Sequence, residues 1–420
     1  MKMQTIRGFN DILPDKIKRW QYIEERARTI FELYGFSEIR PPVLEFTEIF
    51  ARSLGTTTDI VEKEMYTFTD RDGSSLTLRP EGTAGVVRAF IEHSMSVQSP
   101  ITKLYYTGMM FRHERPQKGR YRGFYQVGAE LFGSKDPLSD AEVIVMLWRF
   151  FETIGISSQL KLEISSLGDD NCRPAYKQKL VEFFTPRRND LCEDCQRRLV
   201  GNPLRILDCK KEGCKEIASG APFMQDNLCN ECEDHFESVK EALTHLDTPF
   251  AINSRIVRGL DYYTRTVFEV TTDQLGAQNA VGAGGRYDRL VEELGGTSTP
   301  AVGFAVGMER IMLLHEMVHP EGFKREVDAL IAHLGSKAKK AAFRLAYELR
   351  KIGVFIDIDY EDRSLKSQLK RADKLAAKYT IIIGEEELSR GNVKVRNMKK
   401  SFEEEMNLED VKKLAIRFRI

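Results

Sequence analysis

Apolar residues recur at the three- to four-residue period of an amphipathic helix in two segments of the N-terminal half. In residues 15–34 the apolar positions are Ile17, Trp20, Ile23, Ala27, Ile30 and Tyr34. In residues 139–154 they are Ala141, Val143, Ile144, Leu147, Phe151 and Ile154. Pro14 suits the start of the first segment, and Gly35 follows its end. Both segments are predicted to be helices.

Between these segments the pattern changes to short runs rich in Thr, Tyr, Phe and Leu. The runs cover residues 65–69, 75–78, 101–110 and 123–131. Because they follow one another closely, without a helix between each pair, they predict antiparallel strands. Further along, the pattern predicts a strand at 265–271, a glycine-rich turn at 282–285 and a helix over 303–318.

The last hundred residues alternate apolar runs with helical periods. Apolar runs are found at 328–334, 354–358 and 379–383, and helical periods at 337–351 and 365–378. This alternation predicts a small α/β domain. We place the domains at residues 1–325 and 326–420. All seven cysteines lie in an irregular stretch, residues 169–246, which is predicted to be an insertion in the first domain.

Composition and charge narrow the class of protein only slightly. The 420 residues are 42% apolar and 30% charged, as in an ordinary globular chain. Residues 326–420 carry 21 basic and 16 acidic side chains, a net of +5, within a chain that has 63 of each. This surplus fits a phosphate-binding surface and a plain solvated surface equally well. No apolar run could cross a bilayer, and residues 1–15 lack a signal-peptide core, so we expect a cytoplasmic protein with no membrane partner.

Three arginines are candidates for binding a nucleotide. The glycine-rich phosphate motifs G-x-x-x-x-G-K-[ST] and G-x-G-x-x-G are absent in a suitable setting, so side chains would have to hold the phosphates. Arg112 follows the strand run 101–110, Arg258 opens the block RGLDYYT, and Arg310 closes the block PAVGFAVGMER. A guanidinium binds phosphate oxygens bidentately and keeps its charge. An arginine taken alone is more often an ordinary surface residue. The sequence around each arginine therefore decides whether a nucleotide-binding role is indicated.

The surrounding sequence resembles the motifs of class II aminoacyl-tRNA synthetases, and two blocks resemble the histidyl-tRNA synthetase family in particular. These two blocks are RGLDYYTRTVFE at 258–269 and AVGAGGRYDRL at 280–290. The block LRPEGTA at 78–84 and the long loop 111–126 match as well. The resemblance extends from Arg7 into the C-terminal domain and is weakest in the cysteine-bearing insertion.

The resemblance implies an α+β fold and an activity. The fold would be an antiparallel-sheet catalytic domain with an insertion, followed by an α/β anticodon-binding domain. L-histidine and ATP would give histidyl-adenylate and pyrophosphate, with Mg²⁺ bridging the phosphates, and the histidine would pass to the 3′ end of tRNA(His). In this class the segment 35–44 forms a dimer, so we expect a homodimer.

The resemblance also implies roles for particular side chains. An imidazole has two ring nitrogens, so its site needs a carboxylate acceptor and a polar donor. The residues expected to bind histidine are Glu81, Gly82, Thr83, Gln126, Glu130, Tyr262 and Tyr263. Those expected to bind ATP are Arg112, Glu114, Arg258 and Arg310, of which the three arginines would be catalytic. Those expected to contact tRNA are Arg115, Gln117 and Arg120, for which a solvated loop is an equal alternative.

Two other functions remain open at this point. A regulatory subunit of histidine biosynthesis shares the synthetase fold without the activity, although such paralogues generally lose the C-terminal domain. The sequence His315-Glu316-Met317-Val318-His319 fits the H-E-x-x-H pattern of zinc metalloproteases. Pro320 follows at once and would end the helix that this pattern requires.

The cysteine spacing suggests a metal site rather than disulfides, as expected in a reducing compartment. Two C-x-x-C pairs are present, together with Cys209, Cys214 and the separate Cys172. Our hypothesis is a structural Zn²⁺ bound by Cys192, Cys195, Cys229 and Cys232. Cys209 and Cys214 are possible replacements for one pair, and ordinary reduced thiols are the alternative.

Overall fold

The structure is a computed structural model that describes residues 3–55, 58, 60–256, 260, 262–276, 279–323, 327–400 and 402–419. These residues form two compact units. The first contains the described residues up to Glu321 except Leu13–Lys18, and the second contains that segment and the described residues from Gly322 onward. The expected boundary at 325/326 lies outside the described residues and stays a prediction.

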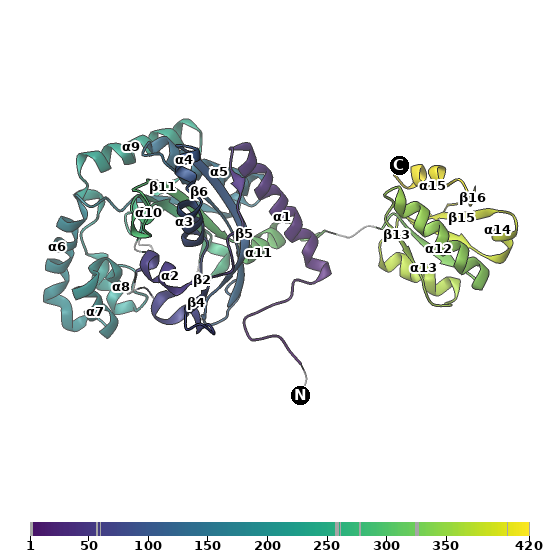
Figure 1. Cartoon of the computed structure of the whole chain (residues 1–420), viewed down its shortest axis with the longest axis horizontal. Helices are drawn as coiled ribbons and strands as arrows, with labels where there is room; N and C mark the ends of the chain where they lie inside the picture. Colours follow the sequence, from purple (N-terminus) through teal and green to yellow (C-terminus); the bar gives the residue numbers. More distant parts are fainter. Residues whose placement is uncertain are drawn as a thin grey trace. The chain divides into compact units, whose positions relative to one another are not determined.

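An eight-stranded sheet is the framework of the first unit (Figure 1). Its strands, in spatial order, are β1 (Ser37–Glu38), β5 (Thr102–Phe111), β6 (Gly123–Phe132), β11 (Ala301–Gly307), β10 (Ala280–Arg286), β9 (Thr264–Thr271), β7 (Lys161–Ser166) and β8 (Ala251–Ile252). The outermost pair at each edge is parallel, and the other pairs are antiparallel. The antiparallel pairing expected for the runs at 101–110 and 123–131 is confirmed.

Helices cover both faces of this sheet. On one face, Phe31 of α1 (Pro14–Leu33) packs edge-on against Tyr105, with ring centroids 5.6 Å apart, and also contacts Phe150 of α5 (Pro137–Thr153). On the other face, Phe90 of α3 (Thr83–Glu92) stacks on Phe132 at 4.4 Å. Neighbouring side chains of a strand point to opposite faces, so Tyr105 and Tyr106 belong to different layers.

Two predictions for the glycine-containing segments were wrong. Residues 282–285 are not a turn but the middle of β10, which pairs with both β9 and β11. Residues 303–318 are not one helix: β11 ends at Gly307, and α11 (Met308–Val318) begins after it. A short buried apolar run has the same pattern in a central strand as in a buried helix, and glycines inside a strand mark a close approach of neighbours.

Smaller elements complete the first unit around the large sheet. A three-stranded sheet has the order β2 (Leu44–Phe46), β4 (Ser75–Leu78) and β3 (Tyr66–Thr69). Both of its strand pairs are antiparallel, as predicted for the runs at 65–69 and 75–78. The short helix α2 (Thr47–Leu54) packs against this sheet, while α4 (Met95–Gln98) and α10 (Leu290–Glu293) pack against α3.

The expected insertion is helical rather than irregular. It contains α6 (Arg173–Phe184), α7 (Glu193–Gly201), α8 (Glu212–Ser219) and α9 (Asn230–His245), the teal helices of Figure 1. Three of these helices are only eight to twelve residues long, which is too short for a clear periodic signal. They enclose an apolar core of their own, in which five of the buried residues are cysteines.

The second unit is the predicted α/β domain. Its sheet has the order β13 (Ile356–Ile358), β12 (Ala329–His333), β14 (Tyr379–Ile383), β15 (Asn392–Asn397) and β16 (Glu403–Asn407). Its helices are α12 (Ser336–Lys351), α13 (Leu365–Lys374), α14 (Glu385–Ser389) and α15 (Val411–Arg419). The elements after residue 383 were not predicted. Among them, β16 lies at the sheet edge and has three glutamates and no buried residue, so it has no apolar alternation. No helix among the described residues combines the length and apolarity needed to cross a membrane.

Candidate active site

A cleft opens on the face of the large sheet, with about 1110 Å³ of empty space that is continuous with solvent at its mouth. Side chains from β6, β9, β10 and β11, from the start of α3 and α11, and from the loop after β5 line it. Segments that are far apart in the sequence therefore converge on one cavity.

Glycines on the sheet make room for two polar side chains of β6. Gln126 and Glu130 point to the same face because they are four residues apart along the strand. Gly303 of β11 is the register partner of Glu130, and a Cβ atom there would collide with the Glu130 carboxylate. A Cβ at Gly128 would collide with the ring of Tyr106. These positions accept no side chain without displacing the residues of the cleft.

Two buried carboxyl groups lie at the inner end of the cleft. Glu81 accepts hydrogen bonds from the backbone N–H groups of Thr83 (2.6 Å) and Ala84 (2.9 Å), which caps the N-terminus of α3. Glu130 is fully buried and accepts from the Thr83 hydroxyl (2.7 Å) and the Tyr287 hydroxyl (2.5 Å). Burial raises the pKa of Glu130 to about 8, against the lowering effect of those two hydrogen bonds.

The surroundings of these carboxyl groups favour a cationic or hydrogen-bond-donating ligand. Burial raises the pKa of Glu81 as well, and it holds the pKa of Tyr262 and Tyr287 well above the ordinary value for a phenol. The tyrosines therefore remain neutral donors. The Oε1 atom of Gln126 is buried and has no hydrogen-bond partner among the described residues. A ligand with N–H groups would satisfy this acceptor and both carboxyl groups.

Arginines gather at the outer end of the cleft. Arg112 donates from Nε to the carbonyl oxygen of Pro80 (2.8 Å), and its guanidinium lies 5.3 Å from the ring centre of Phe124. Arg310 donates from Nε to the carbonyl oxygen of Gly119 (3.3 Å) and from Nη1 to that of Ala280. Burial, followed by the charge of Arg112, lowers the pKa of Arg310. Crowded, half-buried cations of this kind are stabilised by an anion such as a phosphate.

Two further carboxylates line the outer end. The backbone N–H of Tyr125 donates to both carboxylate oxygens of Glu309, at 2.9 and 3.2 Å. Burial raises the pKa of Glu309 to about 7. Glu269 of β9 also lines the cleft. Carboxylates beside a phosphate site are the ligands by which proteins usually hold Mg²⁺.

The structure brings most of the predicted site residues together. The predicted residues that line the cleft are Glu81, Thr83, Arg112, Glu114, Arg120, Gln126, Glu130, Tyr262, Tyr263 and Arg310. Gly82 precedes α3 directly, between two lining residues. Arg258 lies outside the described residues. Arg115 and Gln117 are exposed on the loop after β5 and do not line the cleft, whereas Arg120 forms an ion pair with Glu114 inside it.

The sequence analysis assigned no role to several lining residues. They are Phe124, Glu269, Tyr287 and Glu309. Tyr287 lies in the block AVGAGGRYDRL, and Glu309 directly precedes Arg310. Their positions within or next to the matching blocks were the only indication in the sequence that they belong to the site. Only the folded structure shows that their side chains reach the cleft.

The H-E-x-x-H segment has no metal-site geometry. His315 is buried and contacts the ring of His319 at 4.5 Å, and α11 ends at Val318. Burial lowers the pKa of His315 to about 4. Among the described residues, the groups of side chains close enough to share a metal ion do not include this segment. The metalloprotease hypothesis has no structural support.

The predicted set of four zinc ligands was wrong in its grouping. One cluster contains Cys192, Cys195, Cys209 and Cys214. A second contains Asp169, Cys172, Cys229 and Cys232. The two C-x-x-C pairs start different helices, α7 and α9, and so belong to different clusters. The sequence analysis left open that Cys209 and Cys214 replace one of the two pairs. The first cluster has this composition, with Cys209 and Cys214 in place of Cys229 and Cys232.

The chain is similar to known proteins over nearly its whole length. Residues 8–311 match the family model described as histidyl-tRNA synthetase, and residues 328–417 match the model of an anticodon binding domain. The chain is 54% identical over 409 residues to the histidine–tRNA ligase of Trichlorobacter lovleyi, covering 97% of each chain. It is 54% identical over 393 residues to that of Geobacter sulfurreducens, covering 94% of each.

Solved structures show the same relationship. The structure is similar to that of apo S. aureus histidyl-tRNA synthetase, with a TM-score of 0.84, 38% identity and full coverage of both chains. It also resembles an ATP phosphoribosyltransferase regulatory subunit/histidyl-tRNA synthetase from Bacillus halodurans, with a TM-score of 0.64, 21% identity and coverage of 91% and 99%. The latter likeness concerns the fold alone.

Proposed function

The chain belongs to the histidyl-tRNA synthetase family and is a histidine–tRNA ligase, and from this premise we propose how its cleft performs the reaction. The inner end of the cleft binds L-histidine, and the outer end binds ATP. The histidine carboxylate attacks the α-phosphorus, and pyrophosphate leaves. The terminal ribose hydroxyl of tRNA(His) then attacks the histidyl carbonyl, and AMP leaves. The observation that carries this proposal is the pairing of buried carboxyl groups with clustered arginines in one cavity.

At the inner end, the buried polar groups select histidine. Glu81 and Thr83 hold the α-ammonium group, while Glu130 accepts a hydrogen bond from one imidazole N–H. A phenol of Tyr262 or Tyr263 donates to the other ring nitrogen. An amino acid that lacks these groups would leave the buried Oε1 atom of Gln126 without a donor, which is costly in a site of this kind.

At the outer end, catalysis depends on positioning and charge. Arg112 and Arg310 bind the triphosphate. Arg258 is outside the described residues, and its proposed role, to balance the charge that builds between carboxylate and α-phosphate, rests on the family resemblance alone. Glu269 and Glu309 are the candidate ligands for Mg²⁺ that neutralises the phosphates. Held in line, the carboxylate and phosphorus react without a covalent enzyme intermediate, as charge builds against fixed guanidinium groups.

The tRNA would contact both units. In the first unit, the exposed Arg115 and Gln117 project from the loop at the cleft, where an acceptor end would enter. In the second unit, Lys366, Lys370 and Lys374 are exposed on α13. Arg371 of the same helix and Lys378, which follows the helix, form ion pairs with Asp357 (3.0 Å) and Asp328 (3.2 Å). The three exposed lysines are therefore the candidate phosphate contacts of α13.

The regulatory-subunit alternative is not favoured. The buried carboxyl pair, the arginines and the C-terminal domain that a ligase needs are all present, and the relatives at 54% identity are ligases. Since tRNA charging serves translation in the cytoplasm, we propose that compartment for the protein.

The direct test of this function is histidine-dependent exchange of label between pyrophosphate and ATP. We expect exchange with histidine and Mg²⁺ and background rates with each of the other nineteen amino acids. Charging of tRNA(His) transcripts should follow. Histidine binding by calorimetry without any exchange would instead support the regulatory-subunit reading.

We also propose a homodimer formed through the segment 35–44 and the three-stranded sheet that continues it. This segment and its sheet expose apolar side chains: Val43 (42% exposed), Phe46 (59%) and, across β4, Phe68 (46%). Phe46 and Phe68 are both register partners of Leu76, so they form one row. Contiguous exposed apolar surface of this kind marks a protein interface.

Phe46→Asp should therefore convert the dimer to a monomer at micromolar concentration. A buried, unpaired carboxylate in the interface would cost several kcal/mol, about a thousandfold in the dissociation constant. Light scattering after size exclusion measures the mass. Val200→Asp, at an 81% exposed valine on α7, is the control that should leave the mass unchanged. A Phe46→Asp protein with the wild-type mass would contradict this interface.

A further inference from the structure

All seven cysteines of the chain lie in the two side-chain clusters of the insertion, and none forms a disulfide. Within each cluster the potential ligand atoms lie within 4.8 Å of one another. Seven thiols distributed at random over an insertion would not converge on two points. The described residues that line the cleft include no cysteine, so the two clusters are separate from that site.

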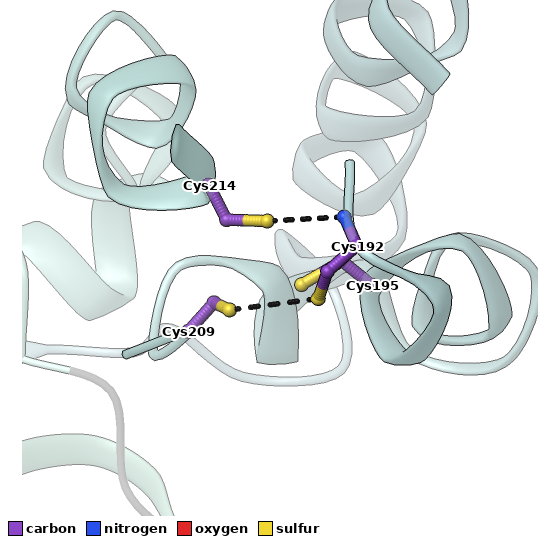
Figure 2. A group of neighbouring side chains, drawn as sticks. All are labelled: Cys192, Cys195, Cys209 and Cys214. Carbon is purple, nitrogen blue, oxygen red and sulfur yellow. Dashed lines mark hydrogen bonds between the residues drawn. The ribbon is translucent and has the colours of Figure 1, made fainter. Parts of the chain in front are cut away.

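The first cluster has the dimensions of a tetrahedral thiolate site. In Figure 2 the side chains of Cys192, Cys195, Cys209 and Cys214 point toward a common centre. The Sγ atoms of Cys192 and Cys209 are 3.9 Å apart. Zn–S bonds of about 2.3 Å at the tetrahedral angle separate sulfur atoms by about 3.8 Å, whereas a disulfide needs about 2.05 Å.

Backbone groups around this cluster favour thiolates. Cys192 is the N-cap of α7, and Cys195 lies in its first turn, where the helix dipole stabilises negative charge. The backbone N–H of Cys192 donates to Sγ of Cys214 at 3.3 Å. Such N–H···S contacts orient the ligands of a metal and offset the charge of the thiolates. Cys195, Cys209 and Cys214 are buried, so the site is closed to solvent on most sides.

The second cluster repeats this arrangement with one oxygen ligand. Cys229 is the N-cap of α9 with nearly the same backbone angles as Cys192 (φ −77°, ψ 160° against φ −66°, ψ 159°). The Sγ atoms of Cys172 and Cys232 are 3.9 Å apart, and Sγ of Cys229 is 3.8 Å from Oδ1 of Asp169. Arg265 donates to the other carboxylate oxygen at 3.2 Å, which fixes the orientation of Asp169.

We propose that the insertion is held together by two structural zinc ions, one bound by Cys192, Cys195, Cys209 and Cys214 and the other by Asp169, Cys172, Cys229 and Cys232. Four protein ligands leave no open position, as in structural rather than catalytic zinc sites. The first ion joins α7 and α8. The second ties the start of the insertion to its last helix, because Cys172 and Cys232 are 60 residues apart in the chain. Short helices around a small core commonly need such a cross-link.

Elemental analysis of the full-length protein, purified without chelator and without an affinity tag that binds metal, tests the proposal. We expect two zinc ions per chain in the wild type. Cys209→Ser and Cys229→Ser should each retain one. Leu199→Ala, a change in the same apolar core that removes no ligand, should lower the thermal midpoint but keep two zinc ions. This control separates loss of metal from loss of packing.

A second measurement covers variants that fail to fold. Titration of the wild-type protein with a mercurial thiol reagent, in the presence of a chromogenic zinc indicator, should release two zinc ions as the seven thiols react. Replacement by Co²⁺ should give the visible absorption of tetrahedral cobalt thiolate. If the wild type held one zinc ion per chain and Cys209→Ser lost it, the second site would be overturned. If the wild type held one zinc ion and Cys229→Ser lost it, the first site would be overturned. Iron in place of zinc, or no metal with freely reactive thiols, would overturn the proposal entirely. None of these outcomes depends on histidine activation.

Discussion

Arg112→Ala should lower kcat for histidine-dependent ATP–pyrophosphate exchange by about two to three orders of magnitude, the usual cost of removing one preorganised group from a transition state that gains charge. Arg112 is held in place before ATP arrives. Its Nε donates to the Pro80 carbonyl, and its guanidinium lies against Phe124. In the proposed arrangement Arg112 faces the phosphates at the moment of transfer, so KM for histidine should change little.

Arg112→Lys is the matched control for charge. A lysine keeps the positive charge but loses the planar fork and the contact with the Pro80 carbonyl, so its kcat should lie between those of the wild type and the alanine variant. The thermal midpoint should be measured for all three proteins, because Arg112 also anchors the loop after β5. An alanine variant with wild-type kcat and an intact fold would remove Arg112 from the catalytic set.

Much of the fold was accessible from periodicity and residue type. The helices that became α1, α5 and α12 were located by their apolar period, and the strands β4 to β6 by their content of Thr, Tyr, Phe and Leu, all within about three residues. The strands β10 and β11 were misassigned because neither signal is present. They lie at the centre of the sheet, where small and apolar residues occupy both faces and the alternation disappears.

The site was predicted by resemblance rather than by pattern. Glu81, Glu130 and Arg310 are separated by 49 and 180 residues in the chain, and no spacing rule connects them. The strand register brings them together: Glu130 pairs with Gly303 on β11, and β11 leads directly into α11 and Arg310. Tyr287 was overlooked because only its hydroxyl, at the end of a buried ring, reaches Glu130.

The cysteines show the limit of spacing arguments most clearly. The spacing of two C-x-x-C pairs predicted that both pairs bind one metal ion. In the structure each pair lies at the start of a different helix, so the pairs belong to different clusters. Which thiols meet depends on how the helices of the insertion fold back, and Asp169 gave no signal at all, since an isolated acidic residue has no characteristic pattern.

Glu130→Gln should raise KM for histidine by about 10- to 100-fold with a smaller change in kcat. The amide keeps an acceptor and nearly the same shape, but it cannot lose a proton when histidine binds and so cannot become a charged partner for the imidazole. Hydrogen bonds to a charged group are worth about 1.5–3 kcal/mol. Steady-state exchange rates over a range of histidine concentrations measure this. Val127→Ala, a neighbouring buried change on the opposite face of β6, should leave KM for histidine unaltered. Equal KM values for the Gln variant and the wild type would place the imidazole elsewhere.

The same carboxyl group should also make the stability of the ligand-free protein depend on pH. In the folded state burial raises the pKa of Glu130 to about 8, from an ordinary value of 4.5. Between these values the unfolded chain releases the proton while the folded chain keeps it, so the folded state binds more protons and its stability falls as pH rises. Glu130→Gln removes this one titration and leaves those of Glu81 and Glu309 in place. Urea unfolding at pH 5 and at pH 8 should therefore show wild type losing stability relative to the glutamine variant at the higher pH. A stability difference that does not change between the two pH values would mean that Glu130 is already ionised in the empty cleft.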